Sequence, residues 1–296
     1  MAVGFRPGLL LDASRGDRVL GTGWWYPTTA TSGTRAAYEL LPGISHEGGA
    51  FEQAPADVDG PVYVFSHGRS GTHRVYTVLA EGLAARGYHV VTMDHPGDTT
   101  FDWALGTAVS DEDNERQRLD DLAFILDELR TANDSLPLLT EGRPVLLGGH
   151  SYGAYTALGG AAAASRAVNL RGVAVLEPYL LRLTAAQLAA VPVATLLVAG
   201  ANDTTTPADV DPPHAAAHLN PDLLSSVIFE GVGHQGCSDV GLYAEVLDEH
   251  PEVPETIASF VRDTAATVTG TLGDPWRPVV ERHVVAVDDF CRPLAF

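Results

Sequence analysis

The sequence predicts an α/β fold in which a mostly parallel central sheet carries helices on both of its faces. Short apolar runs alternate with amphipathic stretches along the chain, which is the pattern of β-α units in a parallel sheet. The runs are nearly continuous in apolar residues, as expected for strands that are covered on both faces. Of the 296 residues, 45% are hydrophobic and 19% are charged, a soluble globular composition. We expect one domain over residues 1–296, since single α/β domains often reach this length.

The elements of this pattern can be placed by residue number. The expected parallel strands are Val62–Phe65, His89–Met93, Val145–Leu147, Val173–Leu176, Thr195–Ala199 and Val227–Phe229. The clearest helices are Thr72–Arg86, Glu115–Arg130, Tyr152–Ala164 and Pro254–Thr264. In the second helix the apolar residues form one stripe with charges opposite, as the helical period requires: Leu119, Leu122, Ile125, Leu126 and Leu129.

The two ends of the chain depart from the β-α pattern. Arg18–Tyr26 and Ala36–Leu41 predict an antiparallel opening to the sheet. The segment Gly43–Gly60 is rich in Gly, Pro and acidic residues and predicts a loop. Towards the end, Val279–Val287 and the tail with Cys291 predict a terminal extension that packs on the body.

Charge and composition exclude several classes of function. The formal net charge of −20 repels phosphates, so nucleic acid is not expected as a partner. The chain has no lysine, which excludes Schiff-base chemistry on a lysine and the lysine of a typical P-loop. We expect neither an organic cofactor nor a metal ion.

The start of the chain and its cysteines bear on its location. Met1–Asp12 lacks the basic start and long apolar stretch of a secretory leader, and no apolar run is long enough to cross a bilayer. A cytoplasmic location is therefore expected, with secretion possible for a chain whose leader has been removed. Cys237 and Cys291 can pair once or stay reduced and buried, and the leaderless start favours the second.

The strongest chemical signal lies directly after the strand Val145–Leu147. Gly149-His150-Ser151-Tyr152-Gly153 matches the nucleophile elbow G-x-S-x-G, and an apolar helix follows it. The motif needs glycine on both sides because the serine occupies a sharp, strained strand-to-helix turn. In this context the motif predicts the α/β-hydrolase fold, with Ser151 as a nucleophile.

A serine nucleophile needs a base and a carboxylate, which follow it in the order acid, then histidine. His234 is the leading base because it lies in a Gly-rich loop after the last expected parallel strand. The histidines before Ser151 have the wrong order, and the later ones lack the strand-then-loop setting. His214 and His218 have helical spacing but no further ligands nearby, so a solvated helix face is the favoured interpretation.

Two carboxylates compete to orient His234. Asp203 follows the strand Thr195–Ala199 and is favoured, while Glu177 follows the preceding strand and is the alternative acid. Both come at carboxyl ends of strands, where open α/β sheets place their chemistry. Asp239, close to His234 in sequence, is interpreted as a helix cap.

Acyl transfer also needs two backbone donors for the oxyanion. The expected donors are the amide of Tyr152, directly after the nucleophile, and the amide of Arg69 in the turn after Val62–Phe65. Substrate contacts are expected from the large side chains in loops at the carboxyl ends of the strands: Arg69, Phe101, Trp103 and Tyr179.

At these residues the chain resembles the platelet-activating-factor acetylhydrolase and cutinase-like branch of the α/β-hydrolases. The resemblance rests on Phe65-Ser66-His67-Gly68, on the elbow, and on His234-Gln235. It implies an oxyanion segment at the first of these and favours the acetylhydrolase side, since cutinases carry Trp where Tyr179 stands. Acetylhydrolases have an aspartate at the position of Glu177, whereas cutinase-like enzymes take the acid from the loop of Asp203, so the resemblance leaves the acid open.

The sequence thus predicts a serine esterase that acts through an acyl-enzyme on Ser151, on a small-molecule or lipid-like ester. Three alternatives stay open: a thioesterase or acyltransferase with the same triad, a cutinase-like polyester hydrolase, and a pseudo-hydrolase that binds without turnover. The sequence does not indicate an oligomeric state.

Overall fold

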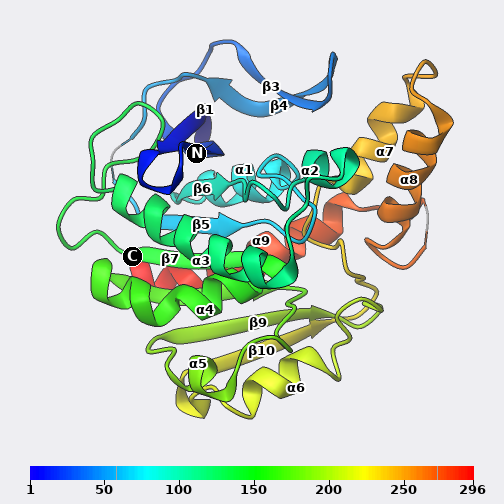
Figure 1. Ribbon diagram of the computed structural model, residues 1–296. Helices are drawn as coiled ribbons and strands as arrows, with labels where there is room; N and C mark the ends of the chain where they lie inside the picture. The colour runs from blue at the N-terminus through cyan, green and yellow to red at the C-terminus, as the bar shows by residue number, and fades with distance from the viewer. Residues whose placement is uncertain (58, 272) are drawn as a thin grey trace.

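The computed structural model describes residues 1–57, 59–271 and 273–296 and has the predicted α/β-hydrolase fold (Figure 1). Ten strands form one sheet in the order β10-β9-β8-β7-β5-β6-β2-β1-β4-β3. The six strands from β10 to β6 are parallel to their neighbours, and β2 joins β6 in antiparallel orientation. The parallel strands are β5 (Val62–Ser66), β6 (His89–Met93), β7 (Val145–His150), β8 (Leu170–Leu176), β9 (Ala194–Gly200) and β10 (Leu224–Phe229).

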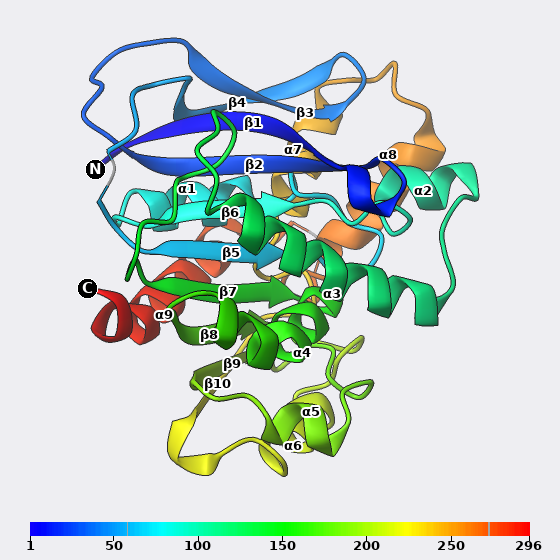
Figure 2. The ribbon, with the colours of Figure 1, turned by 60° about the vertical axis from the view of Figure 1, so that its left-hand side comes forward.

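Helices cover both faces of the parallel strands (Figure 2). In β5, Val62 and Val64 join a core with helices α3 and α4, whereas Tyr63 and Phe65 join a second core with α1 and α9. This alternation follows from the two-residue period of a strand and explains why all five residues of β5 are buried. The helices of the described chain are α1 (Thr77–Ala84), α2 (Thr100–Leu105), α3 (Asp111–Glu128), α4 (Tyr152–Ala167), α5 (Ala185–Ala189), α6 (Asp211–Ala216), α7 (Val240–Asp248), α8 (Glu255–Ala266) and α9 (Arg277–Ala295).

The antiparallel end of the sheet is larger than the sequence predicted. Besides β2 (Arg18–Thr28) and β3 (Arg35–Leu41), it contains β1 (Ala2–Asp12) and β4 (Ile44–Glu52). β1 pairs with β2 along its whole length, yet Leu9 and Leu11 point to solvent, so its apolar residues do not mark a buried strand.

The expected loop Gly43–Gly60 was wrong over β4. Gly48 and Gly49 suggested a turn, but in β4 they let Glu81 of α1 approach the strand, where its carboxylate accepts hydrogen bonds from the amides of Gly49 and Ala50. The glycines of this strand mark a close approach of a side chain and not a chain reversal.

Helix ends also differ from the expectations. The helix expected over Thr72–Arg86 begins only at Thr77, where the Asp239 carboxylate accepts hydrogen bonds from the first amides of α1. Asp239 stands at the start of α7 as predicted, but its side chain caps α1 and makes no cap bond in α7. The terminal extension is the long helix α9, which packs against α1 and β8.

The described residues contain no helix long and apolar enough to cross a membrane. Cys237 and Cys291 are buried free thiols. Burial raises the pKa of both thiols, which keeps them protonated.

Candidate active site

Ser151 lies at the turn between β7 and α4, where the backbone is strained. Its φ of 52° and ψ of −116° belong to a conformation that non-glycine residues rarely adopt. A Cβ on Gly149 would overlap the backbone of Gly153, and a Cβ on Gly153 would overlap the carbonyl of Ser66 at the end of β5. The two glycines of the motif are therefore required by the close approach of three backbone segments.

Ser151, His234 and Asp203 form one line of hydrogen bonds. His234 Nε2 lies 3.0 Å from Ser151 Oγ, and His234 Nδ1 lies 2.8 Å from Asp203 Oδ2. The loop after β10 carries His234 and the loop after β9 carries Asp203, so three separate strand ends supply the line. Ser151 is 7% exposed, so the residue is buried but not fully enclosed.

The Asp203 carboxylate is fixed by its own loop. Oδ1 accepts hydrogen bonds from the amides of Thr205 and Thr206, at 2.8 and 2.9 Å, and Oδ2 accepts one from the Thr206 hydroxyl at 2.7 Å. Burial raises the pKa of Asp203, but the hydrogen bonds from His234 and Thr206 outweigh it and hold this pKa below its usual value. Asp203 is therefore a charged acceptor for the Nδ1 proton of His234.

Glu177, the rival acid, has a different partner. Its Oε1 lies 2.7 Å from Nε2 of His283, a residue of α9, and both side chains are fully buried. Its Oε2 has no hydrogen-bond partner among the described residues. Glu177 also has a positive φ of 40° at the end of β8. The structure thus brings Asp203 to His234, and Glu177 to a histidine that sequence reasoning did not connect with it.

His150, the residue before Ser151, holds the loop that carries His234 through a hydrogen bond. Its Nε2 donates to the carbonyl oxygen of His234 at 2.7 Å, and its Nδ1 accepts from the Tyr76 hydroxyl at 2.9 Å. Burial first, and then the neighbouring His234, lower the pKa of His150 to about 3, so it is neutral. The second position of the elbow, His150, therefore links β7 to the loop that carries His234.

The expected oxyanion donors lie on two segments that meet at Ser151. A Cβ on Gly68 would lie 3.2 Å from the Cβ of Ser151, so the segment after β5 lies directly against Ser151. Tyr152 opens α4, and the first amides of a helix have no partner within it. In the described part of the chain, neither the Arg69 amide nor the Tyr152 amide donates to a backbone or side-chain acceptor.

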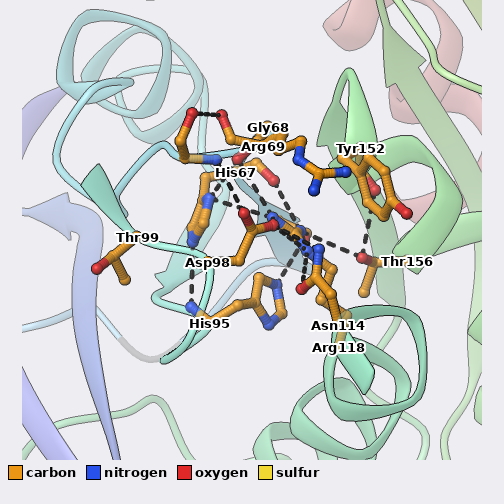
Figure 3. Close-up of polar contacts among 12 residues, drawn as sticks. His67, Gly68, Arg69, His95, Asp98, Thr99, Asn114, Arg118, Tyr152 and Thr156 are labelled. Atoms are coloured by element: carbon orange, nitrogen blue, oxygen red, sulfur yellow. Dashed lines mark hydrogen bonds and ion pairs between the residues drawn. The ribbon is translucent and has the colours of Figure 1, made fainter. Parts of the chain in front are cut away.

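The expected substrate residues are only partly brought together. Tyr179 stacks on Tyr152 with ring centroids 5.2 Å apart. The Arg69 guanidinium lies over the rings of both Trp103 and Tyr152, at 5.2 and 5.5 Å, beside the latter in Figure 3. Phe101 is 54% exposed on α2 and takes no part in these stacking and cation–π pairs of the described residues. We call this group of three aromatic side chains and one arginine the aromatic rim: Arg69, Trp103, Tyr152 and Tyr179.

A buried group that includes His150, next to Ser151 in sequence, has metal-ligand chemistry, but its histidine has no free ring nitrogen. Ligand-type atoms of His150, Glu177 and Cys237 lie within 4.8 Å of one another. Both ring nitrogens of His150 already have hydrogen-bond partners. A metal ion would have to break one of these bonds, so we assign none to this group.

Sequence reasoning missed a charged cluster beneath the oxyanion segment. Arg118 of α3 is fully buried and pairs with Asp98 at 2.7 Å. Arg118 lies four residues before Leu122 and seven before Ile125, which places it on the apolar stripe of its helix. A charge on a buried stripe was the signal that could have revealed it.

Comparison with known proteins identifies the family. Residues 59–226, more than half of the chain, match the protein-family model described as serine aminopeptidase, S33. The solved structure of a ferulic acid esterase from Streptomyces cinnamoneus is similar, with a TM-score of 0.70 and 22% sequence identity over 99% of this chain and 91% of the esterase. A predicted CIB-like hydrolase from Thermoplasma acidophilum has a TM-score of 0.53 and 16% identity over 89% of this chain and 97% of its own. No curated protein matches the chain.

At these identities the two structures support the fold and not a shared substrate. The family match supports the α/β-hydrolase part of the resemblance, while the acetylhydrolase and cutinase-like branch stays a prediction. The chain belongs to the serine aminopeptidase, S33 family of the α/β-hydrolase superfamily.

Proposed function

We propose that this protein is a serine carboxylic-ester hydrolase that works through an acyl-enzyme on Ser151. One observation carries the proposal: the unbroken hydrogen-bonded line from Ser151 through His234 to Asp203 at a strained elbow. His234 is the general base and Asp203 the acid that orients it. The fixed, ionised Asp203 carboxylate favours the tautomer of His234 whose Nε2 is free to take a proton.

The reaction proceeds in two displacements. Ser151 Oγ attacks the ester carbonyl while His234 Nε2 takes its proton, and the amides of Arg69 and Tyr152 donate to the oxyanion that forms. Collapse of this intermediate breaks the bond to the alcohol oxygen, which leaves with the proton from His234. Water then attacks the acyl-enzyme with the same proton transfers and releases the carboxylic acid.

The rim of the site supports a substrate with an apolar or aromatic portion. Tyr179, whose amide donates to the Ser151 carbonyl at 3.0 Å, stacks on the buried ring of Tyr152, and the half-exposed Trp103 indole lies against Arg69. Arg69 adds a cation partly neutralised by Asp111 at 2.6 Å. The similar protein from Streptomyces cinnamoneus is a ferulic acid esterase, and ferulic acid is an aromatic acid, which agrees with this rim. The resemblance of the sequence to acetylhydrolases supports a substrate whose acyl group is short.

A panel of chromogenic substrates tests the proposal. Purified protein is assayed with 4-nitrophenyl esters graded by acyl length, methyl ferulate, an acyl thioester and aminoacyl 4-nitroanilides. We expect ester turnover with a burst of one nitrophenol per protein, and none with Ser151→Ala, whose fold is checked by circular dichroism.

Each rival activity has its own outcome in this panel or in two added assays, one with an acceptor alcohol and one with a polyester film. Faster cleavage of the anilides than of every ester would replace the proposal with an aminopeptidase activity, and a preference for the thioester would replace it with a thioesterase. Transfer to an added alcohol in place of hydrolysis would indicate an acyltransferase. Release of acid from a polyester film would indicate a cutinase-like enzyme, and no turnover by folded protein would leave a pseudo-hydrolase.

A further inference from the structure

The segment His67–Arg69 rests on a buried arginine that reaches it from α3. Figure 3 shows the Arg118 guanidinium and the Asp98 carboxylate meeting beneath Gly68 and Arg69. Arg118 donates from Nη1 to the carbonyl oxygen of His67 at 2.9 Å and from Nη2 to that of Gly68 at 3.2 Å. One planar guanidinium therefore holds two successive peptide groups of the oxyanion segment.

The second of these peptide groups contains the proposed oxyanion donor. The carbonyl of Gly68 and the amide N–H of Arg69 belong to one planar unit and point in opposite directions. The hydrogen bond that turns the Gly68 carbonyl towards Arg118 therefore turns the Arg69 N–H to the opposite side, away from Arg118. Withdrawal of electron density at the carbonyl also makes that N–H a stronger donor, since hydrogen bonds in a chain polarise one another.

Two other groups hold the same carbonyl. His67 Nδ1 and the amide of Gly71 also donate to the Gly68 oxygen, at 2.6 and 3.1 Å. The amide of Gly68 donates to the Tyr76 hydroxyl at 3.0 Å. Arg118 is the charged member of this set, and it is the one that also reaches α4, with its guanidinium 5.3 Å from the centre of the Tyr152 ring.

Arg118 is itself held in one orientation. Asp98 Oδ2 accepts from both Nε and Nη2, at 3.0 and 2.7 Å, and Asn114 also accepts from Nε at 3.2 Å. Asp98 Oδ1 accepts from the amide of Ser70 and from the Trp103 indole. The Asp98 carboxylate therefore ties Arg118 to the far end of the same turn and to the aromatic rim.

We propose that Arg118 is a positioning residue for the oxyanion hole, which fixes and polarises the Gly68–Arg69 peptide so that its N–H meets the transition state. The inference rests on the proposed function. A cation that only stabilised the fold would support substrate and transition state equally. A positioning residue lowers kcat more than it raises KM when it is replaced.

The test compares Arg118→Lys and Arg118→Met with a matched control, Arg18→Met. Arg18 is also paired with a buried aspartate of α3, Asp121 at 2.7 Å, but it donates to Asp121 and the Pro96 carbonyl and to no group of His67–Arg69 among the described contacts. Each folded variant is assayed for kcat and KM, and for inhibition by a trifluoromethyl ketone, which adds to the serine and places an oxyanion in the hole. Arg118→Lys keeps the charge and is the variant used if Arg118→Met does not fold.

We expect Arg118→Lys to lower kcat by about 10-fold or more, against the roughly 10²- to 10³-fold loss for a missing oxyanion donor. KM should stay within a few-fold, the ketone should weaken in parallel with kcat/KM, and Arg18→Met should keep wild-type kcat. Wild-type kcat and ketone affinity in folded Arg118→Lys would overturn the inference while ester turnover by the wild type preserves the proposed function. A wild type that neither hydrolyses esters nor binds the ketone would overturn both.

Discussion

Two carboxylate–histidine pairs lie at the ends of neighbouring strands, and they differ in what the second histidine nitrogen meets. Asp203, which follows β9, lies 2.8 Å from His234. Glu177, which follows β8, lies 2.7 Å from His283 of α9. The free nitrogen of His234 reaches the hydroxyl of Ser151 at 3.0 Å. The other nitrogen of His283, Nδ1, is not free, because it donates to the carbonyl oxygen of Val279 in its own helix at 2.8 Å.

This difference separates a pair suited to proton transfer from a pair suited to packing. A carbonyl oxygen only accepts, so Nδ1 of His283 carries a proton and cannot serve as a base. In the first pair the other histidine nitrogen faces the Ser151 hydroxyl, whereas in the second pair it is bound inside the core. The comparison teaches that a carboxylate next to a histidine does not define a triad unless the other nitrogen faces the reacting group.

The largest expected effect falls on the pair that faces Ser151. Asp203→Asn should lower kcat by roughly 10³- to 10⁴-fold because the amide favours the wrong tautomer of His234. Initial rates with a short-chain 4-nitrophenyl ester measure it, with circular dichroism as the control for folding. A loss of less than about tenfold would assign the orienting role elsewhere and break the comparison.

Replacements in the buried pair of Glu177 and His283 should affect the stability of the fold more than the chemistry. Glu177→Leu alone leaves His283 without its partner in the core and should cost about 3–5 kcal/mol of unfolding free energy. The double variant Glu177→Leu/His283→Leu should recover much of that loss, since apolar side chains of similar size can replace a buried pair. Urea denaturation of these two variants and of His283→Leu alone measures this, and a double variant at least as unstable as the sum of the two single ones would contradict a coupled pair.

His150, beneath His234, should make stability fall in acid. Its pKa is about 3 in the folded protein, against about 6.5 for an unfolded histidine, so only the unfolded chain binds the proton between these values. From pH 6.5 to 5 the protein should therefore lose about 2 kcal/mol of stability through this group. His150→Gln should remove that part of the slope in urea titrations at several pH values, and the exposed His218→Gln should keep it. An unchanged slope in His150→Gln would refute the buried neutral state of this ring.

The smallest effect expected is that of Glu177→Gln on chemistry. The amide keeps the shape of the side chain, and Glu177 makes its hydrogen bond to His283 and not to His234. The kcat of the folded variant should stay within about threefold of wild type, because the change removes no interaction with the reacting atoms. A loss comparable to that of Asp203→Asn would show that the two pairs act as one unit.

The central sheet could be predicted from the sequence because each of its parallel strands contains a short, nearly continuous apolar run. The strand Val62–Phe65 is observed as Val62–Ser66 and His89–Met93 is observed with the same bounds. β1 and β4 were missed because buried and exposed residues alternate over much of each strand and both strands contain glycines. Their pattern therefore differs from that of a central strand, which is covered on both faces.

The elbow was predictable because backbone crowding leaves only glycine at two of its positions. Which of Asp203 and Glu177 contacts His234 was not, because both follow strands, and the partner of Glu177 lies in α9, more than a hundred residues away. Arg118 lay hidden for a similar reason: its partners Asp98, His67 and Gly68 come from two loops that meet α3 only in the folded chain.

Covalent labelling of Ser151 tests the central claim most directly. The native protein is treated with a fluorophosphonate, and the adduct is located by peptide mass spectrometry, with Ser151→Ala and Asp203→Asn as comparison variants. The account predicts one adduct on Ser151 in the wild type, none in Ser151→Ala, and markedly slower labelling in Asp203→Asn. A folded wild type that stays unlabelled, or one labelled on another residue, would contradict it.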